Sequence, residues 1–397
     1  MKLVHVVPSY WPAVRYGGPV RSVHGLCAGL AAGGHDVRVL TTNIDGAGVS
    51  DVPLDRPVER DGVQISYFAP GLGRRLYRAP ALADALRRSL AAADVVHLHA
   101  VYLWPGFAAA RLAARAGVPY VVSPRGMLVR DLIERKSRLA KTLWITLVER
   151  RTLARAGAIH VTSEAEAAAL RHLGLDLAPV VLVPNGVDLP PAGAMAADDG
   201  AWAGAPAGGR LLCLGRISWE KGLDRAIRAL GRLDEAVLVI AGNDETGFRP
   251  ELERLAAELG VGARVRFVGP VEGQAKWSLL AAADLLVLPS LSENFGLVVL
   301  EALGVGTPVV VTAGVGAAEI VRRHELGAVE AGEPEPLAAA IEGLLRDPDR
   351  RRSIAERGPA LIRRHYGWRA LASEMERLYA GLAPGGSAVP SGAAVAV

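Results

Sequence analysis

Cysteine is scarce in this sequence: Cys27 and Cys213 are the only two among 397 residues. A single pair so far apart offers no disulfide framework of the kind that stabilises small secreted domains. Hydrophobic residues make up 51% of the chain, yet no apolar run reaches the length of about 18 residues that a membrane-spanning helix needs. The stretch Met1–Val7 runs directly into Pro8, so we interpret it as a buried strand and not as a signal peptide. These absences predict a cytoplasmic protein.

Net charge is also small, which argues against a nucleic-acid partner. The chain has 45 basic and 41 acidic residues, a balance of +4. One segment departs from this balance, because Arg125–Arg155 contains nine basic and three acidic residues, a local charge of +6. Leucines and Trp144 recur there at helical spacing. We expect an amphipathic helix that packs on a sheet. Alternatively, residues 130–151 are a candidate surface for binding an anionic membrane, which would place the protein at the inner face of that membrane.

Short apolar runs alternate with longer stretches of helical period, in two series. Such alternation predicts α/β domains, each with a parallel sheet that is covered by helices on both faces. The first series of predicted strands is Val4–Val7, Val37–Leu40, Val95–Leu98, Tyr120–Val122 and Ala158–Val161, with helices near 19–32, 81–92, 105–116, 138–155 and 164–173. The second series of strands is Leu211–Leu214, Ala236–Ile240, Val265–Val268, Leu285–Leu288 and Pro308–Val311.

A break between the two series predicts the domain boundary. Residues 190–209 are rich in Gly, Ala and Pro and lack periodicity, so they are interpreted as a linker between a domain over 1–189 and a domain over 210–365. Residues 383–397 are of low complexity and are expected to be disordered. Two doubly wound domains with a flexible joint suggest a cleft, and ligands of such sheets lie beyond the carboxyl ends of the strands.

One strand-end loop carries two cations. A predicted strand ends at Gly215, Arg216 follows at once, and Lys221 comes five residues later, just before a helix. Arg offers a planar fork for phosphate oxygens and Lys a compact point charge, so this loop could hold a diphosphate. Taken alone, the two residues would more often be solvated surface charges.

A second strand-end loop carries two carboxylates. Glu293 and Glu301 are separated by seven residues, and the loop becomes a helix between them. Free backbone N–H groups at a helix start can bind phosphate. Glu301 is placed to accept hydrogen bonds from the hydroxyls of a ribose, and Glu293 lies nearer to where a sugar would project. Taken alone, this spacing would more often be an exposed helix face. The residues at the loop-to-helix transition are Asn294, Phe295, Gly296 and Leu297.

The two motifs together resemble the C-terminal half of the group 1 retaining glycosyltransferases (family 4), which have the GT-B fold. Gly215-Arg216 followed by Lys221-Gly222, and Glu293 followed by Glu301, match that family in order and separation. The resemblance covers nearly the whole chain. It implies two Rossmann-like doubly wound domains facing across a cleft, with a helix over 366–382 that packs back on the first domain. It also implies that a hexose-type sugar is transferred from a UDP- or GDP-sugar with retention of configuration.

The N-terminal half is similar to the same family. Gly17 and Gly18 follow the first strand where the family has a glycine-rich loop near the donor. His97 and His99 end a strand, and one ring is expected inside the domain and the other at its rim. The resemblance assigns His99 to the transferred sugar, although a lone histidine at a strand end is more often structural. If the reaction inverted configuration, His99 would be a candidate general base. Residues 123–127 resemble a stretch of bacterial surface-polysaccharide transferases, which favours a lipid-linked saccharide acceptor.

No cofactor or metal is expected. The only Asp-x-Asp sequence is Asp347-Pro348-Asp349, which we interpret as a helix terminus. The charge of the leaving group would then be stabilised by Arg216, Lys221 and backbone amides. Three alternatives stay open: an epimerase or hydrolase of the same fold, a non-catalytic protein that binds sugar nucleotides, and an NAD-dependent dehydrogenase, although its glycine fingerprint is missing.

Overall fold

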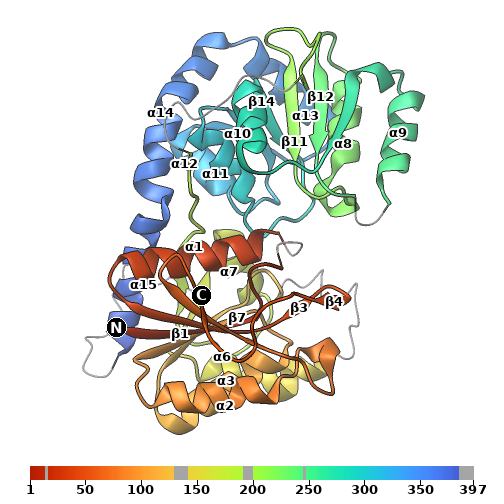
Figure 1. The fold of residues 1–397 in the computed structure, drawn as a ribbon. Helices are drawn as coiled ribbons and strands as arrows, with labels where there is room; N and C mark the ends of the chain where they lie inside the picture. The colour runs from red at the N-terminus through yellow and green to blue at the C-terminus, as the bar shows by residue number, and fades with distance from the viewer. Residues whose placement is uncertain (14–16, 129–141, 191–199, 245–246, 384–397) are drawn as a thin grey trace. The chain divides into compact units, whose positions relative to one another are not determined.

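A computed structural model describes residues 1–13, 17–128, 142–190, 200–244 and 247–383 (Figure 1). The chain divides into two compact units. The first unit is Met1–Gly186 with Trp368–Val397, and the second is Val187–Gly367. The chain thus leaves the first unit after Gly186 and returns to it at Trp368. Apart from its first residue, the predicted tail at 383–397 lies outside the described residues.

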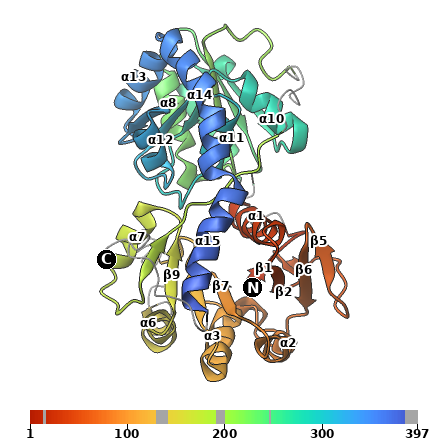
Figure 2. The same cartoon turned by 90° about the vertical axis from the view of Figure 1, so that its left-hand side faces the viewer.

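The described part of the first unit contains an eight-stranded sheet in the order β10-β9-β8-β7-β1-β2-β6-β5. All neighbours are parallel except β5 and β6. Helices α1 and α15 cover one face, and α2, α3 and α6 cover the other (Figures 1 and 2). The strands are β1 Lys2–Ser9, β2 Asp36–Thr42, β5 Val58–Arg60, β6 Val63–Phe68, β7 Val95–His99, β8 Tyr120–Ser123, β9 Ala158–Val161 and β10 Val180–Leu182, and a separate hairpin pairs β3 Ile44–Asp45 with β4 Gly48–Val49. The helices are α1 Gly18–Ala32, α2 Pro80–Leu90, α3 Trp104–Ala116, α6 Arg150–Ala154, α7 Glu164–Arg171 and α15 Trp368–Leu382, with a 3-10 turn η2 at Arg74–Leu76.

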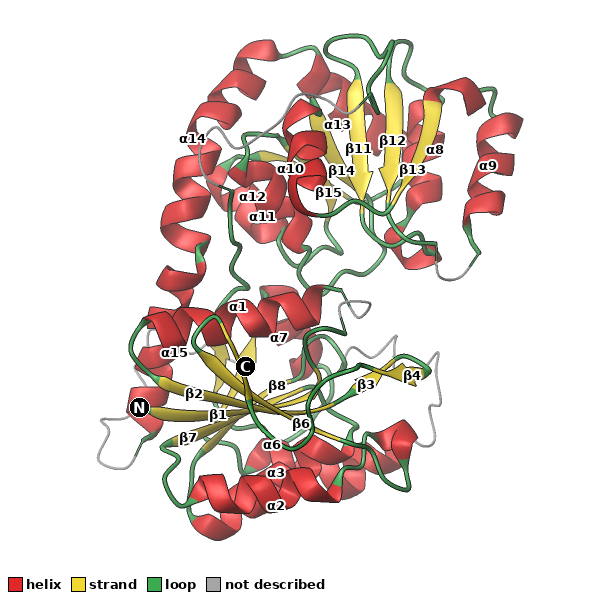
Figure 3. Ribbon diagram, viewed as in Figure 1, coloured by secondary structure: helices red, strands yellow, loops and turns green. Residues whose placement is uncertain are grey.

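The described part of the second unit contains a six-stranded, all-parallel sheet in the order β13-β12-β11-β14-β15-β16 (Figure 3). One hydrophobic core fills this unit on both faces of the sheet. The strands are β11 Arg210–Leu214, β12 Val237–Ala241, β13 Val265–Gly269, β14 Leu285–Leu288, β15 Val309–Thr312 and β16 Gly327–Glu330. The helices are α8 Leu223–Leu230, α9 Arg249–Glu258, α10 Gly273–Ala282, α11 Leu297–Gly304, α12 Ala318–His324, α13 Pro334–Leu345 and α14 Pro348–Tyr366, with 3-10 turns η4 Trp219–Lys221 and η5 Gly262–Arg264.

All ten strands that the sequence predicted are confirmed, with ends that shift by one or two residues. The strands it missed are short or lie toward the sheet edges, such as β10 and β16. The helix expected over 138–155 is confirmed over residues 142–154, where the π-helix Ile145–Glu149 precedes α6, and 138–141 lie outside the described residues. Ser163 caps the helix expected near 164–173, because its side chain accepts a hydrogen bond from the N–H of Glu166. The helix terminus expected at Asp347 is confirmed, because its side chain accepts a hydrogen bond from the N–H of Arg350.

The predicted linker over 190–209 differs from the structure in its second half. Residues 191–199 lie outside the described residues, but Trp202 is only 1% exposed and belongs to the core of the second unit. Its backbone carbonyl accepts a hydrogen bond from the N–H of Ala205. The composition of the segment suggested a loop without a core residue. The indole supplies enough apolar area to anchor it, since a buried aromatic side chain contributes about 1.5–3 kcal/mol.

A chain of hydrogen bonds crosses the first unit from α15 to β10. The carbonyl of Val183 can only accept, so the Nε2 of His160 must carry the hydrogen of that 2.9 Å bond. Nδ1 of His160 then accepts from the hydroxyl of Ser123 at 2.7 Å, and that hydroxyl accepts from Nε2 of His97 at 2.6 Å. Nδ1 of His97 is left to accept from the hydroxyl of Tyr379 at 2.6 Å. All four hydrogen bonds can form only while the imidazoles of His97 and His160 are both neutral.

Acid should therefore destabilise the first unit. Burial lowers the pKa of His160, and likewise that of His5, from 6.5 to about 3. The unfolded chain binds more protons between these values, so stability falls as pH falls below 6.5. At pH 5 each of the two histidines should cost about 2 kcal/mol of unfolding free energy. We expect His160→Gln to lose less stability than the wild type between pH 7 and pH 5 in urea titrations, whereas His172→Gln, at an exposed histidine, should follow the wild type. Equal losses in all three proteins would contradict this account.

Candidate functional site

The strand order of the second unit reverses between β11 and β14, which lie side by side. At such a switch point the loops after the two strands diverge and leave a crevice for a ligand at the carboxyl edge of the sheet. The loop after β11 carries Arg216 and Lys221, and the loop after β14 carries Glu293 and leads to Glu301. The fold therefore brings together the two motifs that the sequence singled out.

The loop after β11 is fixed by its neighbour after β12. Gly215 donates its N–H to Ala241, and Ile217 donates to Asn243, both at 2.9 Å. Gly242 approaches so closely that a Cβ placed on it would lie 1.7 Å from the carbonyl oxygen of Gly215. A side chain at Gly242 would force the strand ends apart, so glycine is required there for the backbone of Arg216 to hold its place.

The two loops of the crevice are joined by backbone and by charge. Leu291 donates its N–H to the carbonyl of Glu220 at 2.9 Å. The ammonium group of Lys221 forms an ion pair with the carboxylate of Glu293, and both side chains are about one-fifth exposed. Glu293 itself is held by a short bridge to the loop after β15, since its N–H donates to Gly314 and its carbonyl accepts from Gly316, both at 2.9 Å.

The start of α11 offers free donors. Gly296 stands at its N-cap with φ +86°, a conformation that strains residues with a Cβ, and no side chain caps the helix. Asn294 and Phe295 precede it, and Leu297 is the first residue of the helix. Because the first N–H groups of a helix have no internal partner, this turn can donate hydrogen bonds to an anion. The backbone at Gly316 packs so closely on Asn294 that the turn is held rigidly.

Glu301, one turn into α11, has a partner that the sequence did not reveal. Nζ of Lys276 on α10 lies 2.9 Å from its carboxylate, and only 8% of Lys276 is exposed. The same ammonium group lies 4.1 Å from the centre of the Trp277 ring. A single lysine inside the apolar stretch of α10 was the available signal, but its partner could not be read from sequence spacing.

Arg216 differs from the other charged residues of this edge. Its side chain is exposed, and among the residues that the structure describes it has no ion-pair or hydrogen-bond partner. Of the two cations predicted here, Lys221 is already paired with Glu293, whereas Arg216 can receive an anion without breaking an ion pair among the described residues.

In the first unit the glycine-rich loop begins a helix. Gly17 is the N-cap of α1 with φ +70°, Gly18 is its first residue, and no side chain caps it. Residues 14–16 lie outside the described residues. The described geometry leaves the first N–H groups of α1 free to bind an anion.

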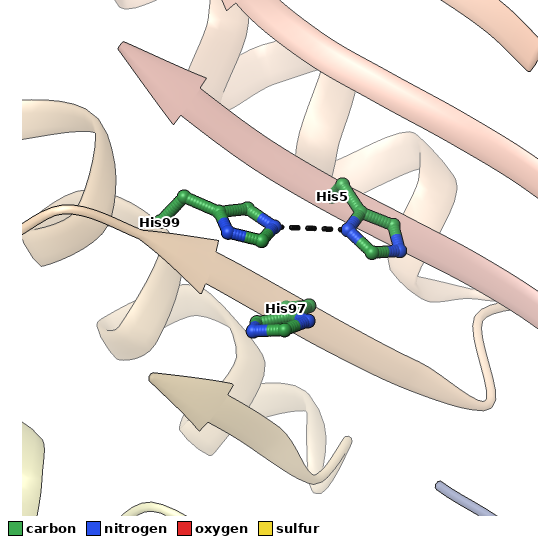
Figure 4. Close-up of side chains that lie close together, drawn as sticks. All are labelled: His5, His97 and His99. Carbon is green, nitrogen blue, oxygen red and sulfur yellow. Dashed lines mark hydrogen bonds between the residues drawn. The ribbon is translucent and has the colours of Figure 1, made fainter. Parts of the chain in front are cut away.

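The prediction for the two strand-end histidines was wrong. Residues two apart on a strand face the same way, and both rings are buried, with His97 1% and His99 2% exposed. Their ring centres lie 4.1 Å apart in a stacked arrangement. Figure 4 shows His99 pointing toward His5 on β1, with Nε2 of His99 3.0 Å from Nδ1 of His5. Neither histidine lies at a rim.

Both nitrogens of His99 are engaged. The guanidinium of Arg125 can only donate, so Nδ1 of His99 accepts from it at 3.3 Å and Nε2–H donates to His5. Burial, followed by the charge of Arg125, holds the pKa of His99 well below 6.5. Because the ring is neutral and has no free lone pair, this arrangement does not support His99 as a general base.

Comparisons with known proteins agree with this geometry. The family model "Glycosyl transferases group 1" matches residues 207–360, and the model "Glycosyl transferase 4-like domain" matches residues 17–186. D-inositol 3-phosphate glycosyltransferase of Xylanimonas cellulosilytica is 34% identical over 302 residues, which cover 72% of each chain. The chain belongs to the group 1 glycosyltransferases.

Two further comparisons extend this result. The lipopolysaccharide core biosynthesis glycosyltransferase LpsE of Rhizobium meliloti is 38% identical over 149 residues. That match covers 37% of this chain and less than half, 43%, of LpsE. The crystal structure of Anabaena HepE in complex with UDP and glucose superposes with a TM-score of 0.70 at 22% identity, covering 95% of this chain and 98% of that one. The fold is thus that of GT-B glycosyltransferases, with two Rossmann-like domains.

The glycosyltransferase has one group of described residues with the spacing of metal ligands, His5, His97 and His99, whose nitrogens lie within 4.8 Å of one another. Both nitrogens of His97 already serve the hydrogen-bond chain to Tyr379 and Ser123. The positive charge of Arg125 lies beside His99. A cation would have to displace these bonds next to a guanidinium, so the chemistry of the cluster favours a structural role.

The cations of the second unit should be needed for turnover and not for folding. We expect Arg216→Ala and Lys221→Ala each to reduce kcat by roughly 10²–10³, the usual loss when one preorganised charge-stabilising group is removed. Transfer from labelled donor measures the rate, and thermal unfolding checks the fold. Arg228→Ala, on the exposed face of α8, is the matched control. A folded double variant of Arg216 and Lys221 with a near-normal rate would show that the donor phosphates bind elsewhere.

Proposed function

We propose that this protein is a retaining glycosyltransferase that needs no metal. It transfers a hexose-type sugar from a UDP- or GDP-sugar to an acceptor, and the acceptor is a lipid-linked saccharide used in cell-surface polysaccharide synthesis. The observation that carries the proposal is the convergence of Arg216, Lys221, Glu293 and Glu301 on the switch point of the second unit. The UDP and glucose bound to Anabaena HepE, which shares the fold, support a nucleotide-sugar donor.

Each charged residue of the site would contact a different part of the donor. Arg216, Lys221 and the free N–H groups of α11 would stabilise the diphosphate as its charge grows during bond cleavage. Glu301, oriented by Lys276, would accept hydrogen bonds from the ribose, and Glu293 would hold sugar hydroxyls. Since Glu293 already pairs with Lys221, an arriving phosphate competes with this carboxylate for the ammonium group. That competition would couple occupation of the phosphate site to release of Glu293 toward the sugar.

Retention fits a front-face reaction in this site. The acceptor hydroxyl attacks the anomeric carbon on the side from which the diphosphate departs, and the departing phosphate oxygen takes the acceptor's proton. No side chain then has to act as a covalent nucleophile. NMR of the product made from a donor of known anomeric configuration tests this directly, since inversion at the anomeric carbon would exclude it.

Two other activities are distinguished by their products. An epimerase or hydrolase of the same fold would convert the donor without acceptor, whereas a binding protein would leave the donor intact. Incubating labelled UDP- and GDP-sugars with and without a lipid-linked acceptor, and in excess chelator, separates all three. Transfer that requires acceptor and survives chelation is the expected result. A preceding thermal-shift comparison of UDP, GDP and ADP selects the nucleotide.

The acceptor proposal rests on two observations. The relative LpsE takes part in lipopolysaccharide core biosynthesis, according to its name. In addition, the described end of the basic segment exposes Leu143 and Leu147, at 60% and 62%, beside the exposed Arg150 and Arg151. Trp144, which the sequence placed on the same apolar surface, instead donates its indole N–H to Glu149 at 2.9 Å. Among the described residues, no helix combines the length and the apolar character needed to cross a bilayer.

Replacing Glu301 and replacing Glu293 should have different effects on donor binding and on kcat. Glu301→Ala should weaken the binding of the bare nucleoside diphosphate and of the full donor alike, because the ribose belongs to both. Glu293→Ala should not weaken nucleotide binding, because Glu293 would contact the sugar and its loss leaves Lys221 free for phosphate, while it lowers kcat. Calorimetric titration of each variant with the nucleotide and with its sugar conjugate measures both effects. The reverse pattern would exchange the two assignments.

Membrane binding should depend on both charge and the exposed leucines. Each basic residue near an anionic surface contributes about 1 kcal/mol, and salt screens this attraction. We expect co-sedimentation with anionic vesicles to fall on adding salt, in Leu143→Ser/Leu147→Ser, and in a variant with Glu at Arg135, Lys136 and Arg138, which lie outside the described residues. Thr146→Ser, between the leucines, is the control. Equal binding to neutral vesicles, or none to anionic ones, would leave this segment a plain packing helix.

A further inference from the structure

We propose that Arg125 of the first unit is the anchor for an anionic group, a phosphate or a carboxylate, carried by the acceptor. The inference rests on the proposed function because it assigns the anion to the acceptor of that reaction. The anion site itself can be tested without any transfer reaction. The inference goes beyond that function by naming a chemical feature of the substrate.

Arg125 follows β8 at the carboxyl edge of the sheet of the first unit, next to the end of β7. Its Nη1 donates to the side-chain oxygen of Asn185 at 2.8 Å, and its Nη2 donates to Nδ1 of His99 at 3.3 Å. Asn185 and His99 are buried, so they hold the guanidinium in one orientation. Both are neutral acceptors: Asn185 is an amide, and burial and the charge of Arg125 keep the pKa of His99 well below 6.5.

The guanidinium has no counter-ion among the described residues. Its Nε atom is buried and, within the same residues, has no hydrogen-bond partner. The carboxylate that acts on it electrostatically, Glu166, is occupied elsewhere. One oxygen of Glu166 accepts from the N–H of Gly126 at 2.6 Å, and the other accepts from the N–H and the hydroxyl of Thr162 at 2.8 and 3.0 Å. Burial lowers the pKa of Arg125, yet arginine remains charged at neutral pH.

An arginine that is partly withdrawn from water and held by neutral groups is electrostatically incomplete. Burying a charge is costly unless an opposite charge accompanies it. Arg125 is partly exposed, and Nη1 and Nη2 each keep a second N–H beyond the bonds to Asn185 and His99, so its planar guanidinium is suited to bidentate binding of a phosphate or carboxylate. The positions of Asn185 and His99 therefore serve to orient a binding group, and they leave the counter-charge to be supplied by a ligand.

The backbone around Arg125 has the strain that is typical of functional sites. Three residues without glycine's freedom adopt left-handed conformations after the adjacent strands β7 and β8: Ala100 at φ +72°, Tyr102 at +64° and Arg125 at +56°. Hydrogen bonds hold two of them, since Ala100 donates its N–H to Ser123 and Tyr102 donates to the buried carboxylate of Glu149. Strained backbone thus gathers at the same edge of the sheet as the guanidinium of Arg125.

The donor diphosphate is the competing source of an anion. The second unit already supplies Arg216, Lys221 and the N-terminus of α11 for that group. Arg125 belongs to the other unit and lies within residues 123–127, the stretch whose resemblance favours a lipid-linked saccharide acceptor. We therefore assign its anion to the acceptor, and the experiment below separates the two sources.

Calorimetric titration of the full chain with inorganic phosphate, with and without saturating nucleotide, tests the site. The wild type should bind phosphate even when UDP or GDP fills the donor site. Arg125→Gln should raise the phosphate Kd by roughly 10- to 100-fold, the usual loss of a charge-assisted contact. Asn185→Asp should have a similar effect while Arg125 stays in place, because the new carboxylate neutralises the guanidinium. Arg171→Gln removes an exposed charge of the same unit and should change nothing.

The outcomes are distinct. Phosphate binding that is abolished by nucleotide and by Lys221→Ala would place the anion in the donor site and overturn the proposal. So would the absence of phosphate binding, or equal affinity in Arg125→Gln and Arg171→Gln. Nucleotide affinity, measured on the same samples, should be unchanged in Arg125→Gln and Asn185→Asp. If the wild type binds phosphate but no nucleotide, the proposed function fails while the anion site stands. With transfer established, Arg125→Gln should raise KM for a phosphorylated acceptor more than for its neutral counterpart.

Discussion

The ion pair between Lys221 and Glu293 joins the two loops on which the proposed donor site depends. It fixes the loop after β11 against the loop after β14, and it does so with groups that must later separate if phosphate and sugar are to bind them. The neighbouring pair, Lys276 with Glu301, is less exposed and is suited to remain intact. A site built in this way has one exchangeable pair and one permanent pair, and Arg216 beside them is open to solvent. Phosphate binding would then change the partner of only one cation.

The two units differ in the partners that surround their cationic side chains. In the second unit the lysines of the site meet carboxylates, and nearby the backbone turn at Gly296 adds free donors. Among the described residues of the first unit, the side-chain hydrogen bonds of Arg125 go to an amide and an imidazole, and the nearby carboxylate of Glu166 accepts from backbone and hydroxyl donors. The hydrogen-bond chain from Tyr379 to Val183 keeps two further histidines neutral beneath this edge. These imidazoles supply no negative charge, so among the described residues the charge of Arg125 stays uncompensated, which favours the binding of an anion.

Sequence reasoning recovered the features that depend on local pattern. Apolar alternation predicted the central strands, and the order of the two motifs predicted the family, because both are encoded by spacing along the chain. What it missed depends on contacts between distant segments. Lys276 meets Glu301 across two helices, and Arg125 meets Asn185 sixty residues later. The rim position expected for one of the two strand-end histidines was wrong because residues two apart on a strand face the same way, so both rings are buried. Trp202 was missed because a segment rich in Gly and Ala gave no periodic sign of a core residue.

Hydrogen–deuterium exchange of the full chain with and without UDP or GDP tests the central claim, that the carboxyl edge of the second unit binds the nucleoside diphosphate. Exchange reports which backbone N–H groups a ligand protects. We expect slower exchange over 215–222 and 289–301, where the loops after β11 and β14 and the first turn of α11 would contact the nucleotide. Binding of the nucleotide with unchanged exchange in both segments would contradict the account.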